Sequence, residues 1–450
     1  MRRRLHSARP SSALRWSAVR RGLTAVLSAM ALTLALGLWG IRRQNSMWGD
    51  EAVTYELAQR SLADIWRTAL HIDLVHALYY SLMHGLFALF GDGLLTLRLP
   101  SVPAMALAAA GVAVLGLRLA GPRAGLLAGL VFALIPQVQL YEQEGRSYAM
   151  VCALATWSTV LLLAAVSRRT RRWWWAGYGV VMLTACLLHE FAVLVLPAHG
   201  VTLILSGVER RVIRRWAGAA GCVVAGTLPL VVLSACQSGQ VAWIGFPDPT
   251  QLLGLAAMAL VGVWCARHLV RGGRGPVPLP ALALPILLLP GLLLLLFSPV
   301  KPLFVDRYVL YSTIGFALLL GAGLARARTL PSPTWPAWLA LTAVLAALVP
   351  VSIHLRTPES RRDDVIAIGR AVREAAEPGD GLLYVPERRR VWTQTRPQDT
   401  RNLTDLALAQ DPVSADNLAG TELPTRDIPD RIRSFRRIIV VHEARASHWT

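Results

Sequence analysis

The chain has few charged residues and, among them, a single lysine. Only 16% of its 450 residues are charged and 54% are hydrophobic, whereas roughly a quarter of an ordinary soluble domain is charged. A soluble globular protein is therefore excluded. All 46 basic residues except Lys301 are arginine, which indicates a GC-rich genome. The net charge of +19 does not indicate nucleic-acid binding, because the arginines lie in short clusters between apolar segments, a pattern typical of membrane topology.

Cysteine is also scarce. None of the cysteines forms a CxxC pair, and all lie within apolar stretches, where cysteine packs as a small side chain. Neither a disulfide framework nor a zinc site is therefore indicated. The five are Cys152, Cys186, Cys222, Cys236 and Cys265.

Long apolar segments are abundant. A spanning helix needs about 20 predominantly apolar residues, and the candidates predict an all-α polytopic membrane protein of about eleven transmembrane helices, with a membrane domain over residues 22–354. They lie near 22–40, 99–117, 124–140, 148–167, 173–189, 190–208, 216–236, 251–270, 277–298, 308–325 and 335–354.

The arginines predict the orientation of these spans. Residues 1–21 are basic and lack a clear cleavage site, so we expect a retained first helix with a cytoplasmic N-terminus. The five inner loops then hold fifteen arginines, whereas the short outer connections hold three basic residues. A crossing at 74–90 would reverse this asymmetry, so that apolar stretch is interpreted as an interfacial or partly re-entrant helix within a first outer loop, 41–98.

An odd number of crossings places residues 355–450 outside the cytoplasm. A helical pattern at 361–376 and short apolar strands at 381–385 and 437–441 predict a small extracytoplasmic α/β segment there.

The first outer loop begins with an acidic pair, Asp50 and Glu51. A carboxylate at the end of a span can act as a general base on an acceptor hydroxyl at the level of lipid phosphates. The alternative is a cap on the first turn of a helix. The same loop holds Asp73, His76 and Arg98.

Two later outer connections add charge, and His189 lies in an outer turn between them. The first contains Glu142, Glu144 and Arg146. A guanidinium can bind a phosphate with two hydrogen bonds, and a carboxylate can hold a hydroxyl or a divalent cation. Alternatively, one carboxylate pairs with Arg146, and His189 bonds a helix-end carbonyl.

The last outer connection contains Lys301, Arg307 and Tyr308. Two cations and a tyrosine at headgroup depth suit a polyprenyl phosphate, although such residues also anchor helices at the membrane interface.

Five fragments, taken in their order along the chain, resemble the GT-C superfamily of polyprenyl-phosphate-sugar-dependent glycosyltransferases. In particular they resemble its family 39-like branch, which is of protein-mannosyltransferase and aminoarabinose-transferase type. The resemblance is to a chain from an actinobacterium-like source. The second fragment departs from the family pattern, because Ala77 and Leu78 stand where prolines are common. The fragments are residues 48–52, 73–80, 97–101, 143–149 and 306–308.

The resemblance implies inverting transfer of a sugar, mannose by default, from a polyprenyl-phosphate donor to a glycan, lipid or protein hydroxyl, with a divalent cation as an open question. Asp50 and Glu51 would be catalytic. The donor phosphate would be bound by Arg146, Arg307, Lys301 and Tyr308. The acceptor or sugar pocket, or a metal site, would be formed by Glu144, Asp73, His76 and His189.

Two other classes stay open. A transporter or flippase of lipid-linked sugars usually has polar groups at mid-membrane, whereas here the charge gathers on one side. A polysaccharide polymerase or ligase usually has its long outer loop late in the chain, whereas here that loop comes first.

Overall fold

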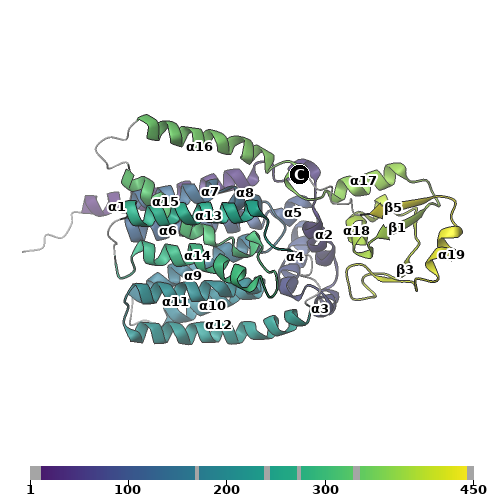
Figure 1. Cartoon of the computed structure of the whole chain (residues 1–450), viewed down its shortest axis with the longest axis horizontal. Coiled ribbons are helices and arrows are strands. Elements are labelled where there is room, and N and C mark those ends of the chain that lie inside the picture. The colour runs from purple at the N-terminus through teal and green to yellow at the C-terminus, as the bar shows by residue number, and fades with distance from the viewer. Residues whose placement is uncertain (1–11, 168–171, 238–243, 271–274, 328–334, 443–450) are drawn as a thin grey trace, which may run out of the picture.

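The computed structural model describes residues 12–167, 172–237, 244–270, 275–327 and 335–442. A bundle of long helices forms one end of the molecule, a small α/β unit forms the other, and short helices lie between them (Figure 1). This order places the polar region that follows the first span between two folded parts.

The bundle contains a helix at each of the predicted spans. Its elements are α1 (Ser12–Leu38), α6 (Ser101–Ala120), α7 (Pro122–Leu134), α8 (Pro136–Tyr141), α9 (Tyr148–Ser167), α10 (Trp173–Leu188), η3 (Glu190–Leu194), α11 (Val195–Leu205), α12 (Arg210–Cys236), α13 (Pro249–Trp264), η5 (Cys265–Leu269), α14 (Leu279–Phe297), α15 (Ser312–Ala327) and α16 (Trp335–His354).

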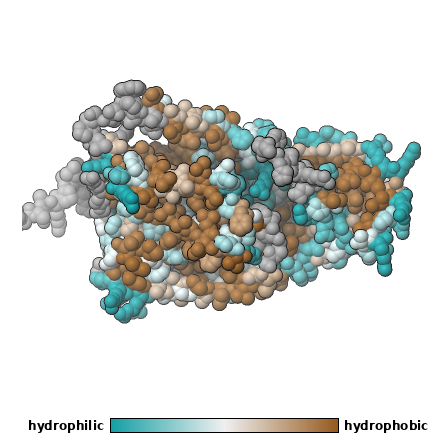
Figure 2. All heavy atoms as spheres, in the orientation of Figure 1, coloured by the Kyte–Doolittle hydropathy of each residue, from teal (hydrophilic) through white to brown (hydrophobic). Residues whose placement is uncertain are grey.

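Among the described residues, six helices are long and apolar enough to cross a membrane, and the other predicted spans lie on shorter apolar helices. The chain is therefore a multi-pass membrane protein. The predicted span 124–140 is divided into α7 and α8, because Pro136 holds Ile135 in an extended conformation and begins the second helix. Figure 2 shows an apolar surface over the bundle helices, as expected for contact with lipid.

Small residues let the bundle helices approach closely. A Cβ atom added to Gly321 of α15 would lie 2.4 Å from the backbone nitrogen of Ala128 in α7, and one added to Gly125 of α7 would lie 2.6 Å from the Ala113 carbonyl oxygen in α6. Close backbone contact is how helices associate where lipid removes the hydrophobic driving force. These contacts join α6, α7 and α15 into the centre of the bundle.

The first outer loop folds into short helices at one end of the bundle. These are η1 (Arg43–Asn45), α2 (Gly49–Gln59), α3 (Leu62–His71), η2 (Leu74–His76), α4 (Ala77–Phe90) and α5 (Leu94–Arg98). The apolar helix α4 packs against α2 and α3.

The α/β unit is built on three parallel strands in the order β2-β1-β5. Strands β3 and β4 form a separate antiparallel pair. The predicted helix and both predicted strands are present, with bounds shifted by a few residues. The elements are η7 (Pro358–Ser360), α17 (Val365–Ala375), β1 (Gly381–Val385), η8 (Glu387–Arg390), α18 (Val391–Gln394), η9 (Pro397–Asp399), β2 (Thr404–Asp405), β3 (Leu408–Gln410), β4 (Thr421–Glu422), α19 (Ile428–Arg433) and β5 (Ile438–His442).

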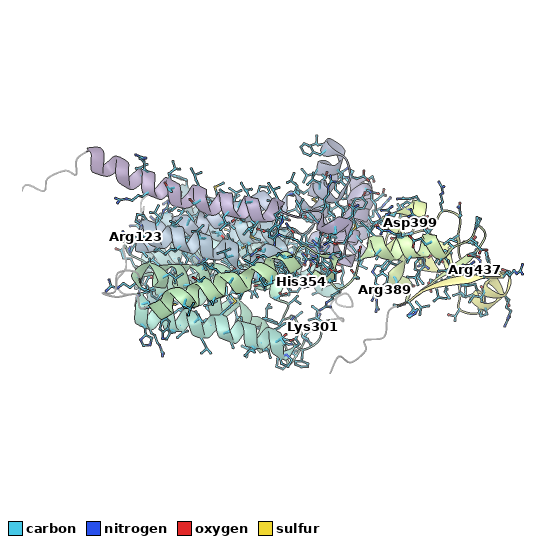
Figure 3. All side chains as sticks on the ribbon, turned by 90° about the horizontal axis from the view of Figure 1, so that it is seen from above. Arg123, Lys301, His354, Arg389, Asp399 and Arg437 are labelled. Carbon is cyan, nitrogen blue, oxygen red and sulfur yellow. The ribbon has the colours of Figure 1, made fainter. Side chains whose placement is uncertain are left out.

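The two ends of the bundle carry different predicted loops. Figure 3 shows Arg123 at the end far from the α/β unit, whereas Lys301 and His354 lie at the end that faces it. Arg123 belongs to a predicted inner loop and Lys301 to a predicted outer one. Arg123 and Lys301 therefore lie at opposite ends of the bundle, as their assignment to different predicted loops requires.

Candidate active site

The acidic pair lies in the first turn of α2, but its two carboxylates have different surroundings. The side chain of Asp50 is 31% exposed, whereas that of Glu51 has no exposed surface. Neighbours in a helix point about 100° apart, so one side chain faces open space while the other enters the protein.

Glu51 is surrounded by donors. Arg98 donates from Nε to Oε1 and from Nη2 to Oε2, both at 2.7 Å. The backbone N–H of Gly145 donates to Oε1 at 3.1 Å, and Arg43 Nη1 donates to Oε2 at 3.4 Å. Burial alone would raise the pKa of Glu51, but the charges of Arg98 and Arg43 outweigh it and lower this pKa to about 2. The resulting anion joins the first outer loop to the connection at 142–147.

Asp50 faces Arg307 instead. Their atoms Oδ2 and Nη2 are 3.4 Å apart, and Arg307 Nε donates to the hydroxyl of Tyr148 at 3.1 Å. The guanidinium carbon lies 5.7 to 5.8 Å from the ring centres of Trp48, Tyr148 and Tyr308. The rings and the hydroxyl hold this cation in place, and the carboxylate beside it stays accessible.

Arg146 forms the second cationic position. Its Nη1 donates to the hydroxyl of Tyr80 at 2.8 Å and to Thr54 Oγ1 at 3.3 Å, and its Nη2 lies 3.9 Å from Asp73 Oδ2. Tyr80 in turn donates its hydroxyl to Asp73. Asp73 adopts a left-handed backbone conformation with φ of 62°, which aspartate tolerates better than most residues. The turn before η2 thereby places a carboxylate beside Arg146.

Two histidines and two tyrosines from separate elements meet next to these cations. The ring centres of His76 and His189 are 5.4 Å apart, and those of His189 and Tyr308 are 4.7 Å apart. Tyr148 lies 5.5 Å from His189 and 6.2 Å from His76. The structure thus brings together residues of the first outer loop, the ends of α9 and α10, and η6 (Asp306–Val309).

The carboxylates of the second connection pair with arginines that follow the last bundle helix. Arg361 Nε lies 3.7 Å from Glu144 Oε2, and Arg356 Nη2 lies 3.6 Å from Glu142 Oε1. The alternative in which one of them pairs with Arg146 is wrong, since Arg146 contacts Tyr80 and Asp73. Burial raises the pKa of Glu144 to about 7 and that of Glu142 above its ordinary value, and in each case the paired arginine opposes the shift.

Sequence reasoning did not assign a role to the segment that leads into the α/β unit. The backbone N–H of Gly49 donates to Asp363 Oδ1 at 2.7 Å, and that of Met47 donates to Asp364 Oδ1 at 3.2 Å. The Val365 N–H donates to the Met47 carbonyl at 2.7 Å. The residues just before Asp50 are therefore fixed by a segment more than 300 positions later. The signal available in the sequence was the polar run 359–364, directly after the last apolar span.

Lys301 is the predicted site residue that lies outside this cluster. It is exposed. No contact between Lys301 and Asp50, Arg146 or Arg307 occurs among the described residues.

The clustered carboxylates and histidines do not form a metal site as they stand. No group of three or more His, Cys, Asp or Glu side chains in the described part of the chain is arranged to hold a metal ion. Asp50 and Asp73 face separate arginines, and Glu51 is saturated by donors.

Comparison with known proteins finds one family model and several solved structures that are similar to this chain. Residues 76–235 match the model of the family described as dolichyl-phosphate-mannose-protein mannosyltransferase, which is less than half of the chain. Comparison with curated protein sequences gives no significant match.

Solved structures share the fold. The oligosaccharyltransferase AglB from Archaeoglobus fulgidus, in complex with an inhibitory peptide and a dolichol-phosphate, is similar with a TM-score of 0.52 and 11% identity over 88% of this chain and 65% of that one. ArnT from Cupriavidus metallidurans, bound to undecaprenyl phosphate, is similar with a TM-score of 0.53 and 16% identity over 82% of this chain and 73% of that one. The chain thus spans about two thirds of these proteins and shares their fold.

Proposed function

We propose that this chain is a membrane glycosyltransferase that moves a sugar from a polyprenyl phosphate to an acceptor hydroxyl outside the cytoplasm. The observation that carries the proposal is the contact of Asp50 with Arg307, in which an accessible carboxylate lies 3.4 Å from a cation held by aromatic rings. Transfer from a lipid phosphate needs a base and a phosphate-binding cation side by side.

The reaction is a single displacement. Asp50 accepts the proton of the acceptor hydroxyl while the hydroxyl oxygen bonds to the anomeric carbon of the sugar. The bond from that carbon to the phosphate oxygen breaks, and the lipid phosphate leaves with the electron pair. Because one attack on one face replaces the leaving group, the anomeric configuration is inverted.

The two members of the acidic pair have separate roles. Glu51 has no exposed surface and accepts hydrogen bonds from Arg98, Arg43 and Gly145, so it is a positioning residue and does not take the acceptor proton. Asp50 is partly exposed beside Arg307 and is the base. This division narrows the sequence prediction, in which both were catalytic.

Arg307 and Arg146 bind the leaving phosphate. Both are held by phenol hydroxyls, Arg307 by Tyr148 and Arg146 by Tyr80, so the cations are ordered before charge develops on the phosphate oxygen. The rings of His76, His189 and Tyr308 offer the sugar a largely apolar wall. Lys301 lies outside this wall, and its contribution is long-range attraction of the anionic donor.

The donor is a mannosyl polyprenyl phosphate in the first instance. The matched family is described by a dolichyl-phosphate-mannose substrate, and the two similar structures hold dolichol-phosphate and undecaprenyl phosphate. The acceptor is a hydroxyl of a glycan, lipid or protein. The arginine pattern supports a site outside the cytoplasm, with the N-terminus cytoplasmic and residues 355–450 extracytoplasmic.

The position of the charged cluster favours transfer over transport. Tyr148 is the first residue of α9, His189 follows the last residue of α10, and Arg307 lies in the turn before α15. The site is therefore built at helix ends, whereas transporters bind substrate midway through interrupted helices.

The test is transfer of label from radiolabelled polyprenyl-phosphate-mannose in membranes that contain the wild-type chain or Asp50→Asn. General-base catalysis contributes about 100-fold or more, so we expect at least that loss at equal protein level. The matched control is Asp430→Asn, an exposed acid-to-amide change on α19, which leaves transfer unchanged. Equal transfer by wild type and Asp50→Asn would disprove the assignment of the base.

A further inference from the structure

A cavity separate from the Asp50 cluster lies between the first outer loop and the α/β unit. Its volume is about 590 Å³, within the range of pockets that enclose small molecules. One wall comes from α2 and α3 and includes Glu56 and Arg60, and the opposite wall comes from the α/β unit and includes Tyr384, Arg390 and Gln394. Contact between α2 and α18 keeps the two walls together.

The charges in the cavity wall are neutralised by protein partners. Arg60 lies 2.8 Å from Glu56, and Arg390 lies 2.6 Å from Asp405. The remaining charged residue of the wall, Asp64, pairs with Arg67. Arg60 also donates to Thr68 Oγ1 and to a backbone carbonyl of the α/β unit. A wall whose charges are already paired favours an uncharged ligand over a phosphate or a cation.

The cavity wall also holds buried polar atoms without a hydrogen-bond partner in the described part of the chain. These are Glu56 Oε2 and both polar atoms of the Gln394 side chain, Nε2 and Oε1. Buried polar groups are normally hydrogen-bonded, so the cost of leaving these enclosed atoms unpaired favours a turn of the Gln394 side chain toward a ligand that supplies partners. A hydroxyl group both donates and accepts, which suits a carboxylate oxygen together with an amide. Leu382, Leu403 and Val413 provide apolar surface beside them.

We propose that this cavity binds a neutral oligosaccharide. An oligosaccharide carries no charge, which matches the paired charges of the wall. Its many adjacent hydroxyl groups match the unpaired amide and carboxylate atoms, and the apolar C–H faces of its rings match the apolar residues.

The assignment of this oligosaccharide as the remote part of the acceptor rests on the proposed function. Helix α2 carries Asp50 in its first turn and Glu56 six residues later, which is about 9 Å along the helix axis. One rigid helix therefore fixes the distance between the proposed base and the cavity. Binding energy gathered away from the reacting hydroxyl can then hold that hydroxyl at Asp50.

The test measures binding of neutral linear trisaccharides of mannose, arabinose or glucose to the full chain in lipid nanodiscs. Saturation-transfer NMR detects the binding, and no donor lipid is present. Val413→Trp fills the cavity at a residue that is 40% exposed, and Gln394→Leu removes the unpaired amide at similar size. Each is expected to weaken binding about tenfold or more. Gln410→Leu is the matched control, because Gln410 is exposed, bonds Ser414 and lies outside the cavity.

Thermal unfolding of each variant identifies loss of fold, and Val413→Trp tests the cavity without removing any hydrogen bond. Binding of at least one trisaccharide, lost in both variants and kept in Gln410→Leu, supports the proposal. Binding to none of them, binding unchanged in Val413→Trp, or preference for a serine-rich peptide or a sulfated trisaccharide overturns it. Asp50→Asn should bind the trisaccharide as wild type does, so failure of the transfer mechanism and failure of this proposal are distinguishable.

Discussion

Arg307 Nη2 lies 3.4 Å from Asp50 Oδ2, at the meeting point of the first outer loop and the turn before α15. Neither residue is fully enclosed, since their side chains are 13% and 31% exposed. The pair therefore marks the place where an acceptor and a phosphate can reach the protein together. A bound phosphate would compete with Asp50 for the same cation and free the carboxylate to take a proton.

Arg307→Lys should separate charge from geometry. Lysine keeps the positive charge but cannot bond a phosphate with two nitrogens or stack on the tyrosine rings as arginine does. We expect the KM for the donor to rise about tenfold, and Arg307→Gln to lose about 100-fold in kcat/KM. Steady-state transfer rates at varied donor concentration measure both. A matched control is Arg433→Lys on the exposed helix α19, and equal loss in that control would contradict the assignment.

Glu51→Gln should damage the fold more than the chemistry. The change leaves Arg98, which is fully buried, without its charged partner, and breaking a buried pair costs on the order of 3–5 kcal/mol. We expect a lower yield of folded protein and a lower unfolding temperature, while the folded fraction retains the pH profile of the wild type. A normal unfolding temperature combined with loss of turnover would instead make Glu51 a catalytic residue.

Stability should fall between acid and neutral pH because of Glu144. Burial raises its pKa from 4.5 in the unfolded chain to about 7 in the fold, so its contribution to stability is fully present below pH 4.5 and is lost as the pH rises to about 7. One pKa unit corresponds to about 1.4 kcal/mol, so the free energy of unfolding falls by about 3 kcal/mol at most.

The glutamine side chain of Glu144→Gln cannot ionise, so this variant does not lose stability as the pH rises. The unfolding temperatures of wild type and variant in nanodiscs should therefore diverge from pH 4.5 to about 7 and then stay apart by a constant amount. Arg361 faces a neutral side chain in both proteins at low pH, and its attraction for the ionised Glu144 is already part of the pKa of about 7. A difference that does not change with pH would show that Glu144 keeps an ordinary pKa.

The sequence predicted the helices well, because each helix needs only a local apolar stretch. It also predicted which loops lie at the same end of the bundle, because arginine clusters mark the loops of one side. Asp50, Asp73, His76, Arg146, His189 and Arg307 do lie together. Local patterns could not separate Asp50 from Glu51, since adjacent carboxylates look alike until the fold buries one of them. Nor could they pair Glu142 with Arg356 or Glu144 with Arg361, because those partners come from the far end of the chain and are chosen by packing. Lys301 is the single lysine of the chain, but the rarity of a residue type does not predict where that residue lies in the fold.

The link from the α/β unit to the acidic pair gives the last prediction. Asp363 accepts the hydrogen bond from the Gly49 N–H at 2.7 Å, and Gly49 begins the helix whose next residue is Asp50. Asp363→Ala leaves that N–H free and lets the start of α2 shift, and a displacement of about 1 Å at a reacting group can cost about 100-fold.

Asp363→Asn keeps an oxygen acceptor for the same N–H, so it should restore most of the activity. We expect kcat to fall at least tenfold in Asp363→Ala while the donor KM changes little, because Arg307 and Arg146 are untouched. Rescue by asparagine separates a positional effect from a charge effect. If both variants lose activity equally, the negative charge of Asp363 near Asp50 matters in place of the hydrogen bond, and if neither does, α2 holds its position without the α/β unit.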